Sequence, residues 1–184
     1  MIRQMRSTSS QYKLEVLNSC GEADFTDALG GVFEHAPWVA EAVIDRRPFA
    51  SVDAMHRAML GVIRSLPEAG LVDFLNVHPE LAGAQARAGV MTDDSIREQG
   101  ALAPGAMTAQ EIARWDRLNR DYRERFGFPF ILCARRHSHA SMLEAFERRL
   151  VRERAVELEA AVQEIEHISR LRLADRIADH GLQI

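Results

Sequence analysis

Apolar residues recur at intervals of three and four along most of this chain, the spacing that places them on one face of an α-helix. The clearest run contains Ile112, Trp115, Leu118, Tyr122 and Phe126. Every long element predicted in this way is helical, and no internal repeat is visible. The pattern therefore predicts an all-α protein.

Helix start and stop signals agree with this pattern. Ser51 is predicted to cap the start of a helix that runs to Ser65. Thr108-Ala109-Gln110-Glu111 has the spacing of a capping box, and the helix that follows is predicted to end at Gly127. Ser141-Met142-Leu143-Glu144 has the same spacing and is predicted to open another helix.

One stretch departs from helical spacing. Phe128 to Ala134 is a short, nearly continuous apolar run that contains Pro129, so we expect an extended segment threaded into the core. The sequence predicts a single-domain helical bundle of about seven to nine helices with this one extended segment, over residues 11–184. Residues 1–10 contain arginine and serine but no apolar stretch, and are predicted to form a flexible lead-in.

Composition and charge narrow the classes of function. The chain has 184 residues, of which 47% are hydrophobic and 27% charged, as in ordinary globular domains. The net charge of −4 argues against binding to nucleic acid or to an anionic membrane, and no apolar run has transmembrane length. Two distant cysteines, Cys20 and Cys133, and the lack of a signal-peptide pattern predict a soluble cytoplasmic protein.

Metal and cofactor chemistry is not expected. The nearest pairs of metal-ligating residues are His137 with His139, Glu34 with His35, and Glu166 with His167. None of these pairs has the i, i+4 histidine spacing of a zinc-binding helix. Lys13 is the only lysine and lies near the N-terminus, which argues against pyridoxal phosphate chemistry, and no glycine-rich nucleotide loop is present.

Acid–base catalysis without a cofactor is the remaining candidate chemistry. His78 directly precedes Pro79, which disfavours the α conformation at His78 and so places it at the end of a helix. An imidazole titrates near neutrality and can carry a proton in either direction, and a carboxylate such as Glu98 could orient it. The spacing alone leaves open a purely structural histidine at a helix terminus.

Several blocks of sequence together resemble the 2-oxo-4-hydroxy-4-carboxy-5-ureidoimidazoline (OHCU) decarboxylase family of ureide metabolism. The blocks are Phe33-Glu34-His35-Ala36-Pro37-Trp38-Val39, His78-Pro79-Glu80-Leu81, Ser95 with Glu98-Gln99, and Phe126-Gly127-Phe128-Pro129-Phe130-Ile131. The resemblance covers nearly the whole chain after the lead-in. It implies an all-α enzyme that needs no metal or organic cofactor and converts OHCU to S-allantoin with loss of CO₂.

The resemblance also implies roles for individual residues. His78 matches the catalytic acid/base, and Glu98 matches a glutamate that binds polar groups of the substrate. The residues expected to bind the small-molecule substrate are Pro79, Ser95, Ile96, Arg97, Glu98, Gln99, Phe130, Ile131, Leu132, Cys133, Ala134 and Arg172. The backbone of Phe130 to Ala134 is expected to contact the planar ring. Arg172 could pair with the substrate carboxylate, or it could be a solvent-facing helix arginine.

Two other functions remain open at this point. A non-catalytic helical interaction module would use His78 and Glu98 only as structural polar groups. The preceding hydrolase step of the same pathway belongs to a small β-rich fold, so a helical structure would exclude it. Members of the family often form dimers, and apolar positions on the last helix would permit a homodimer here.

Overall fold

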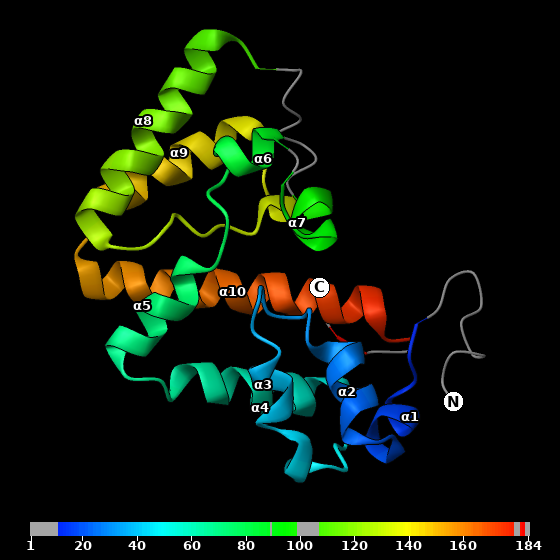
Figure 1. Cartoon of the computed structure of the whole chain (residues 1–184). Coiled ribbons are helices and arrows are strands. Elements are labelled where there is room, and N and C mark those ends of the chain that lie inside the picture. The colour runs from blue at the N-terminus through cyan, green and yellow to red at the C-terminus, as the bar shows by residue number, and fades with distance from the viewer. Residues whose placement is uncertain (1–10, 89, 99–106, 179–180, 183–184) are drawn as a thin grey trace. The chain divides into compact units, whose positions relative to one another are not determined.

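The computed structural model of this chain describes residues 11–88, 90–98, 107–178 and 181–182. Within these ranges it contains ten α-helices, two 3-10 helices and no strand (Figure 1). The α-helices are α1 Leu14–Ser19, α2 Glu22–Leu29, α3 Trp38–Glu41, α4 Val52–Arg64, α5 Glu68–Asn76, α6 Ala84–Ala88, α7 Asp93–Glu98, α8 Ala109–Phe126, α9 His139–Leu150 and α10 Arg154–Arg176. The 3-10 helices are η2 Ile44–Arg46 and η5 Ala134–Arg136. The all-α prediction is confirmed, and the β-rich hydrolase is excluded.

The predicted number of helices is slightly low. Sequence periodicity detects helices long enough to show a repeated apolar face, and the structure adds short ones such as α6, which buries none of its residues. The start of α9 was also predicted too late. Its N-cap is Ser138, whose side chain and that of Ser141 each bind the other residue's backbone N–H, so the capping box lies three residues before the predicted one.

The chain divides into two compact units. The first unit contains Met1–Pro67 and Glu166–Ile184, and the second contains Glu68–Ile165. The first unit therefore holds α1 to α4 and the last part of α10, whereas the second holds α5 to α9 and the first part of α10.

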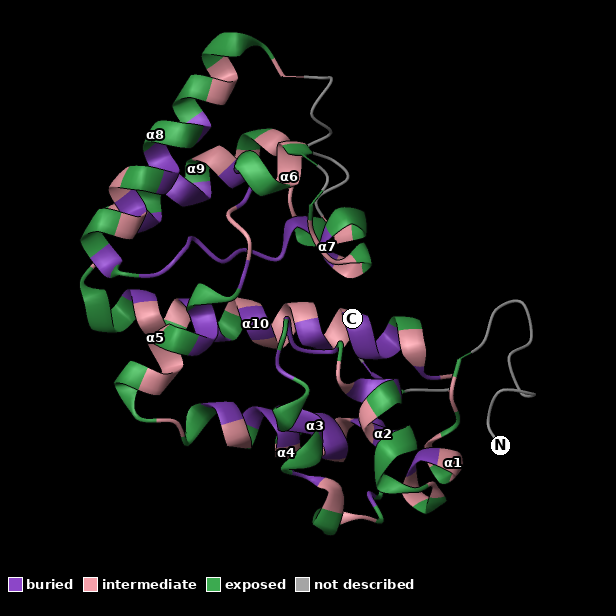
Figure 2. Ribbon diagram, viewed as in Figure 1, coloured by how far each residue is buried: buried purple, intermediate pink, exposed green. Residues whose placement is uncertain are grey.

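The first unit is built around the amphipathic helix α4. As predicted, Ser51 is its N-cap, and the Ser51 side chain accepts a hydrogen bond of 3.0 Å from the N–H of Ala54. The apolar face of α4 is buried, as the purple positions in Figure 2 show; its apolar members are Val52, Met55, Met59, Leu60 and Ile63. Helix α3 lies between α2 and α4 in the sequence and contacts both of them.

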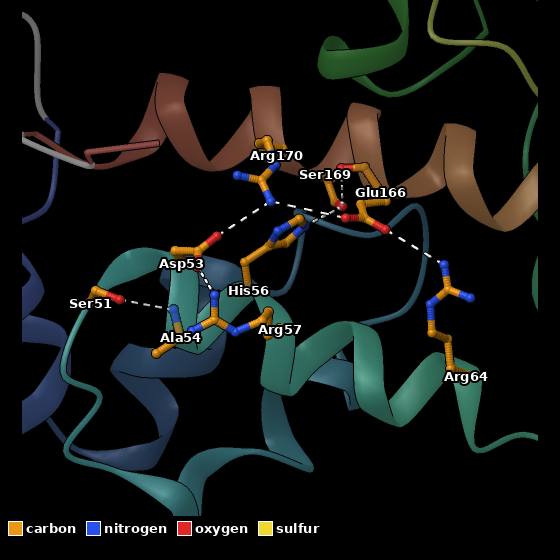
Figure 3. Close-up of polar contacts among 9 residues, drawn as sticks. All are labelled: Ser51, Asp53, Ala54, His56, Arg57, Arg64, Glu166, Ser169 and Arg170. Carbon is orange, nitrogen blue, oxygen red and sulfur yellow. Dashed lines mark hydrogen bonds and ion pairs between the residues drawn. The ribbon is translucent and has the colours of Figure 1, made fainter. Parts of the chain in front are cut away.

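A polar cluster on the α4 face joins that helix to the last turns of α10 (Figure 3). His56 is fully buried, and its Nε2 lies 2.8 Å from Oγ of Ser169, which in turn donates to the carbonyl of Glu166 at 3.2 Å. Because the serine proton is used in this way, Nε2 of His56 is the donor and Nδ1 is unprotonated. Nδ1 is buried and has no hydrogen-bond partner among the described residues. Burial, with a smaller effect of the Arg170 charge, lowers the pKa of His56 to about 4.

The second unit has an aromatic core between α8, α9 and the segment that follows α8. Its rings are all buried and belong to Trp115, Tyr122, Phe126, Phe128, Phe130 and Phe146. The rings of Phe130 and Phe146 are stacked with centroids 3.9 Å apart, and Tyr122 meets Phe130 edge to face at 5.3 Å. Helix α8 has the predicted capping box at Thr108 and ends at Gly127 with φ of 81°.

The segment after α8 is non-helical and buried, as predicted. Residues Phe128 to Ala134 are almost wholly inaccessible to solvent, and the segment is drawn as a continuous purple trace in Figure 2. It ends in the short helix η5.

The buried neutral state of His56 predicts a loss of stability in mild acid. Between pH about 6.5 and about 4 the unfolded chain binds a proton at His56 that the folded chain does not. The free energy of unfolding should therefore fall by up to about 3 kcal/mol as the pH is lowered through this window, and its full value is present above it. Urea unfolding at a series of pH values measures this slope.

A glutamine at position 56 keeps a donor for Ser169 but cannot titrate, so His56→Gln should flatten the slope in this window. His167 lies on the same helix as Ser169 and is partly exposed. His167→Gln is the matched control and should keep the slope of the original chain. An unchanged slope in His56→Gln would contradict the prediction.

Candidate active site

His78 lies just after the end of α5, with 8% of its surface exposed. Its Nδ1 is 3.2 Å from the carbonyl oxygen of Phe74, and the Phe74 ring meets the imidazole edge to face with centroids 5.3 Å apart. Because a carbonyl oxygen only accepts, Nδ1 carries a proton. In the neutral imidazole the lone pair is therefore on Nε2, which makes Nε2 the nitrogen that can take up a proton.

The turn around His78 is held by side chains of α8. Arg123 binds Oε1 of Glu80 through Nε and Oδ1 of Asn76 through Nη1, both at 2.9 Å. Asn119 donates to the carbonyl of Leu81 at 3.0 Å. These bonds involve residues on both sides of His78 and Pro79 in the sequence. Helix α8 therefore fixes the backbone that carries the imidazole.

Helix α7 carries the next group of predicted site residues. Ser95 is buried, and its N–H is 3.3 Å from Oγ1 of Thr92, whereas 42% of Ile96 is exposed. The side chain of Arg97 is largely exposed and forms an ion pair with Asp94 on the same helix. Glu98 is partly buried at the last position of α7. Gln99 lies outside the described residues.

The predicted backbone-binding segment, Phe130 to Ala134, is buried throughout. Two of its backbone groups are bound by side chains: the Ile131 carbonyl accepts from Nη1 of Arg149, and the Cys133 N–H donates to Oε2 of Glu164, both at 2.8 Å. Sequence analysis did not identify either side chain.

The Cys133 thiol is influenced by charges from two other parts of the unit. Burial raises the pKa of Cys133 to about 11, and the carboxylates of Glu164 and Glu98 add to this effect. The Glu98 charge therefore acts on the segment that is predicted to contact the substrate. The raised pKa also makes Cys133 a poor nucleophile, because the thiolate is the reactive form.

Arg172 is placed differently from the rest of the predicted set, because it belongs to the first unit. It is buried rather than solvent-facing, and its Nη1 is 2.8 Å from Oε2 of the buried Glu34. Sequence analysis considered Glu34 as a metal ligand beside His35 and as part of a block that resembles the family, but assigned it no ion-pair partner. Its actual partner is a guanidinium 138 positions later in the chain, and no local pattern indicates such a pairing. The substrate-binding role of Arg172 stays a prediction.

In the described part of the chain, no three His, Cys, Asp or Glu residues are arranged so that they could hold a metal ion. None of the described helices combines the length and the apolar character that crossing a membrane requires.

The sequence of this chain is similar to that of proteins in a known family. The family model described as OHCU decarboxylase matches residues 18–174, which include parts of both units. The chain is 36% identical over 165 residues to the mouse 2-oxo-4-hydroxy-4-carboxy-5-ureidoimidazoline decarboxylase, covering 90% of this chain and 93% of that protein. It is 38% identical over 161 residues to the Amia calva protein of the same name, covering 88% of this chain and 92% of that protein.

Longer relatives match over only part of their length. The Bacillus subtilis uric acid degradation bifunctional protein PucL is 36% identical over 92% of this chain, but only 34% of PucL is covered. Among solved structures, an (S)-allantoin synthase superposes with a TM-score of 0.73 at 25% identity, covering 90% of this chain and 54% of that one. An OHCU decarboxylase structure determined in the presence of (S)-allantoin shares the fold, with a TM-score of 0.58 at 23% identity over 84% of this chain and 96% of that one.

The family match covers most of the chain, and two of the relatives are matched over nearly their whole length at 36% and 38% identity. The confirmed all-α fold agrees with both structural neighbours. The chain therefore belongs to the OHCU decarboxylase family of carboxy-lyases.

Proposed function

We propose that this protein converts OHCU to S-allantoin and CO₂ in urate degradation, with His78 as the acid/base and Glu98 as a substrate-orienting carboxylate. Family membership supports the reaction, and the observation that carries the residue assignment is the fixed imidazole of His78. Its Nδ1 proton is committed to the Phe74 carbonyl, so the basic Nε2 has a defined direction.

The substrate itself supplies the electron sink. One ring carbon carries both the carboxylate and a hydroxyl, next to a C=N bond. When the bond to the carboxylate breaks, CO₂ leaves and the electron pair moves into the conjugated ring system. The hydroxyl then loses its proton and becomes a carbonyl, the neighbouring carbon that carries the ureido group gains a proton, and the ring nitrogen of the former C=N bond gains another. One proton is taken up overall, because an anionic carboxylate leaves as neutral CO₂.

His78 is suited to this proton handling. The neutral imidazole can accept the hydroxyl proton at Nε2 and then return a proton to the carbon. This two-step transfer needs one group that changes its protonation state near neutral pH, as an imidazole does. Delivery by a single fixed group reaches one face of the ring, which accounts for a single enantiomer of the product. The bonds from α8 to Glu80 and Leu81 keep the imidazole in place during the reaction.

The substrate's urea-like edges need hydrogen-bond partners. Glu98 can accept hydrogen bonds from ring and ureido N–H groups, and its charge already acts on Cys133 in the neighbouring segment. Ser95, Gln99 and the backbone of Phe130 to Ala134 would complete this binding surface. The rings of Phe128 and Phe130 pack into the aromatic core, so their part is to hold the segment and to exclude water beneath it.

The product assay tests this function directly. Without a catalyst a proton can reach the ring carbon from either face and give racemic allantoin, so circular dichroism should show optically active allantoin only when the protein is added. His78→Ala should lower kcat by about 10²–10⁴-fold with an unchanged far-UV spectrum, because a general acid–base group contributes that range. His167→Ala is the control and should retain full activity.

Two results would contradict the assignment. Undiminished turnover in His78→Ala would remove the imidazole from the mechanism. Failure of the unmodified protein to accelerate formation of S-allantoin would favour the non-catalytic interaction module instead.

Glu98→Gln tests the role of the carboxylate. This variant keeps the side-chain shape but loses the charge, so KM should rise about tenfold or more, the range for hydrogen bonds that involve a charged group. The same substitution should lower the pKa of Cys133, because the Glu98 charge helps to raise it. The rate of Cys133 alkylation as a function of pH measures this shift.

Glu144 provides the matched control, since it is an exposed glutamate on α9. Glu144→Gln should leave both KM and Cys133 reactivity unchanged. If Glu98→Gln behaved in the same way as this control, Glu98 would have no part in binding the substrate.

A further inference from the structure

Side chains bind two backbone groups of the buried segment Phe130 to Ala134, and its last two carbonyls, of Cys133 and Ala134, accept hydrogen bonds from the N–H groups of Arg136 and His137. Nη1 of Arg149, on α9, donates to the carbonyl of Ile131 at 2.8 Å. The N–H of Cys133 donates to Oε2 of Glu164, on α10, at 2.8 Å. The two bonded groups belong to residues two positions apart, so the backbone is fixed on both sides of Leu132.

Arg149 is itself immobilised. Its Nε lies 2.7 Å from Oε1 of the fully buried Glu157, and its guanidinium carbon is 4.6 Å from the centre of the Phe130 ring. The hydroxyl of Tyr122 donates to the same Glu157 oxygen. A planar guanidinium held by a carboxylate, a ring and a carbonyl has little freedom, so the position of Ile131 is defined by α8, α9 and α10 together.

Glu164 connects this support to the predicted site. It binds the Cys133 N–H, while the charge of Glu98 acts on the thiol of the same residue. Cys133 is therefore bound through its N–H by Glu164 of α10, and its thiol is influenced by the charge of Glu98 on α7. A shift of the Cys133 backbone would change the distance between the segment and Glu98.

We propose that Arg149 and Glu164 are positioning residues for substrate binding, which hold the Ile131 carbonyl and the Cys133 N–H so that Phe130 to Ala134 is already ordered before the substrate arrives. This inference rests on the proposed function, since it assumes that the segment receives the substrate. Neither residue needs to touch the substrate. Their effect is to remove the entropy cost of ordering the segment at the moment of binding.

Glu164 gives the sharper test, because it is only partly buried and its loss leaves no buried unpaired charge. Glu164→Ala should raise KM for OHCU about tenfold, the factor expected for re-ordering one or two backbone residues on binding, with kcat changed by less than about threefold. Glu164→Gln keeps an oxygen acceptor for the Cys133 N–H and should restore KM. Glu159→Ala, an exposed glutamate on the same helix, is the matched control and should leave KM unchanged.

Arg149 requires a compensated variant, because its removal alone would strand the Glu157 charge in the core. The triple variant Tyr122→Phe, Arg149→Met and Glu157→Leu removes the charged pair and its buried hydroxyl partner together. It should show the same rise in KM. Amide hydrogen exchange supplies a readout independent of activity: Ile131 to Ala134 should exchange faster in Glu164→Ala and in the triple variant, while the amides of α8 stay protected.

The outcomes separate this inference from the proposed function. If the unmodified protein produces S-allantoin but Glu164→Ala has the KM of Glu159→Ala, the positioning role is wrong and the proposed function stands. A lower kcat together with a lower thermal midpoint and an unchanged KM would likewise overturn it, because that pattern indicates a loss of folded enzyme. If the unmodified protein does not accelerate the reaction, the proposed function fails and the inference fails with it.

Discussion

A stretch of backbone that is neither helix nor strand can be buried only if other groups bind its N–H and C=O groups. The segment from Phe128 to Cys133 is such a stretch, and it lies in the core of the second unit. Arg149 and Glu164 meet this requirement at Ile131 and Cys133. The helices of this unit are therefore arranged around a segment that they must also hydrogen-bond, which is why buried charge is found in an otherwise apolar core.

Buried charge carries its own requirement. A carboxylate such as Glu157, with no exposed surface, is stable only when hydrogen bonds and an opposite charge compensate its desolvation. Arg149 and Tyr122 provide this compensation, and burial with the bond to Glu157 raises the pKa of the Tyr122 hydroxyl, which stays protonated and donates. Such a pair adds little to stability compared with apolar packing of the same volume. Its value here is geometric, because it fixes the direction of the guanidinium that binds Ile131.

Local features of the fold could be predicted from the sequence, because caps and turns depend on residues only a few positions apart. Thr108 with Glu111, the left-handed Gly127 and the extended run after it are all of this kind. The ion pairs of Glu34 with Arg172 and of Arg149 with Glu157 could not be predicted, since an arginine on a helix looks the same whether it faces solvent or a buried carboxylate. For the same reason, the Arg149 and Glu164 contacts had no sequence signal. His78 could be singled out because Pro79 marks its helix boundary and because the block His78-Pro79-Glu80-Leu81 resembles the family.

The two halves of the candidate site share one mode of construction. His78 lies in the connection after α5, and α8 binds that connection through Arg123 and Asn119. The segment from Phe130 to Ala134 lies in the connection after α8, and α9 and α10 bind it. Connections can present backbone N–H and C=O atoms to a ligand, which the interior of a helix cannot, because its own hydrogen bonds occupy them. A planar substrate with several N–H and C=O edges needs such atoms at fixed positions, and long polar side chains from rigid helices are what give these connections the required order.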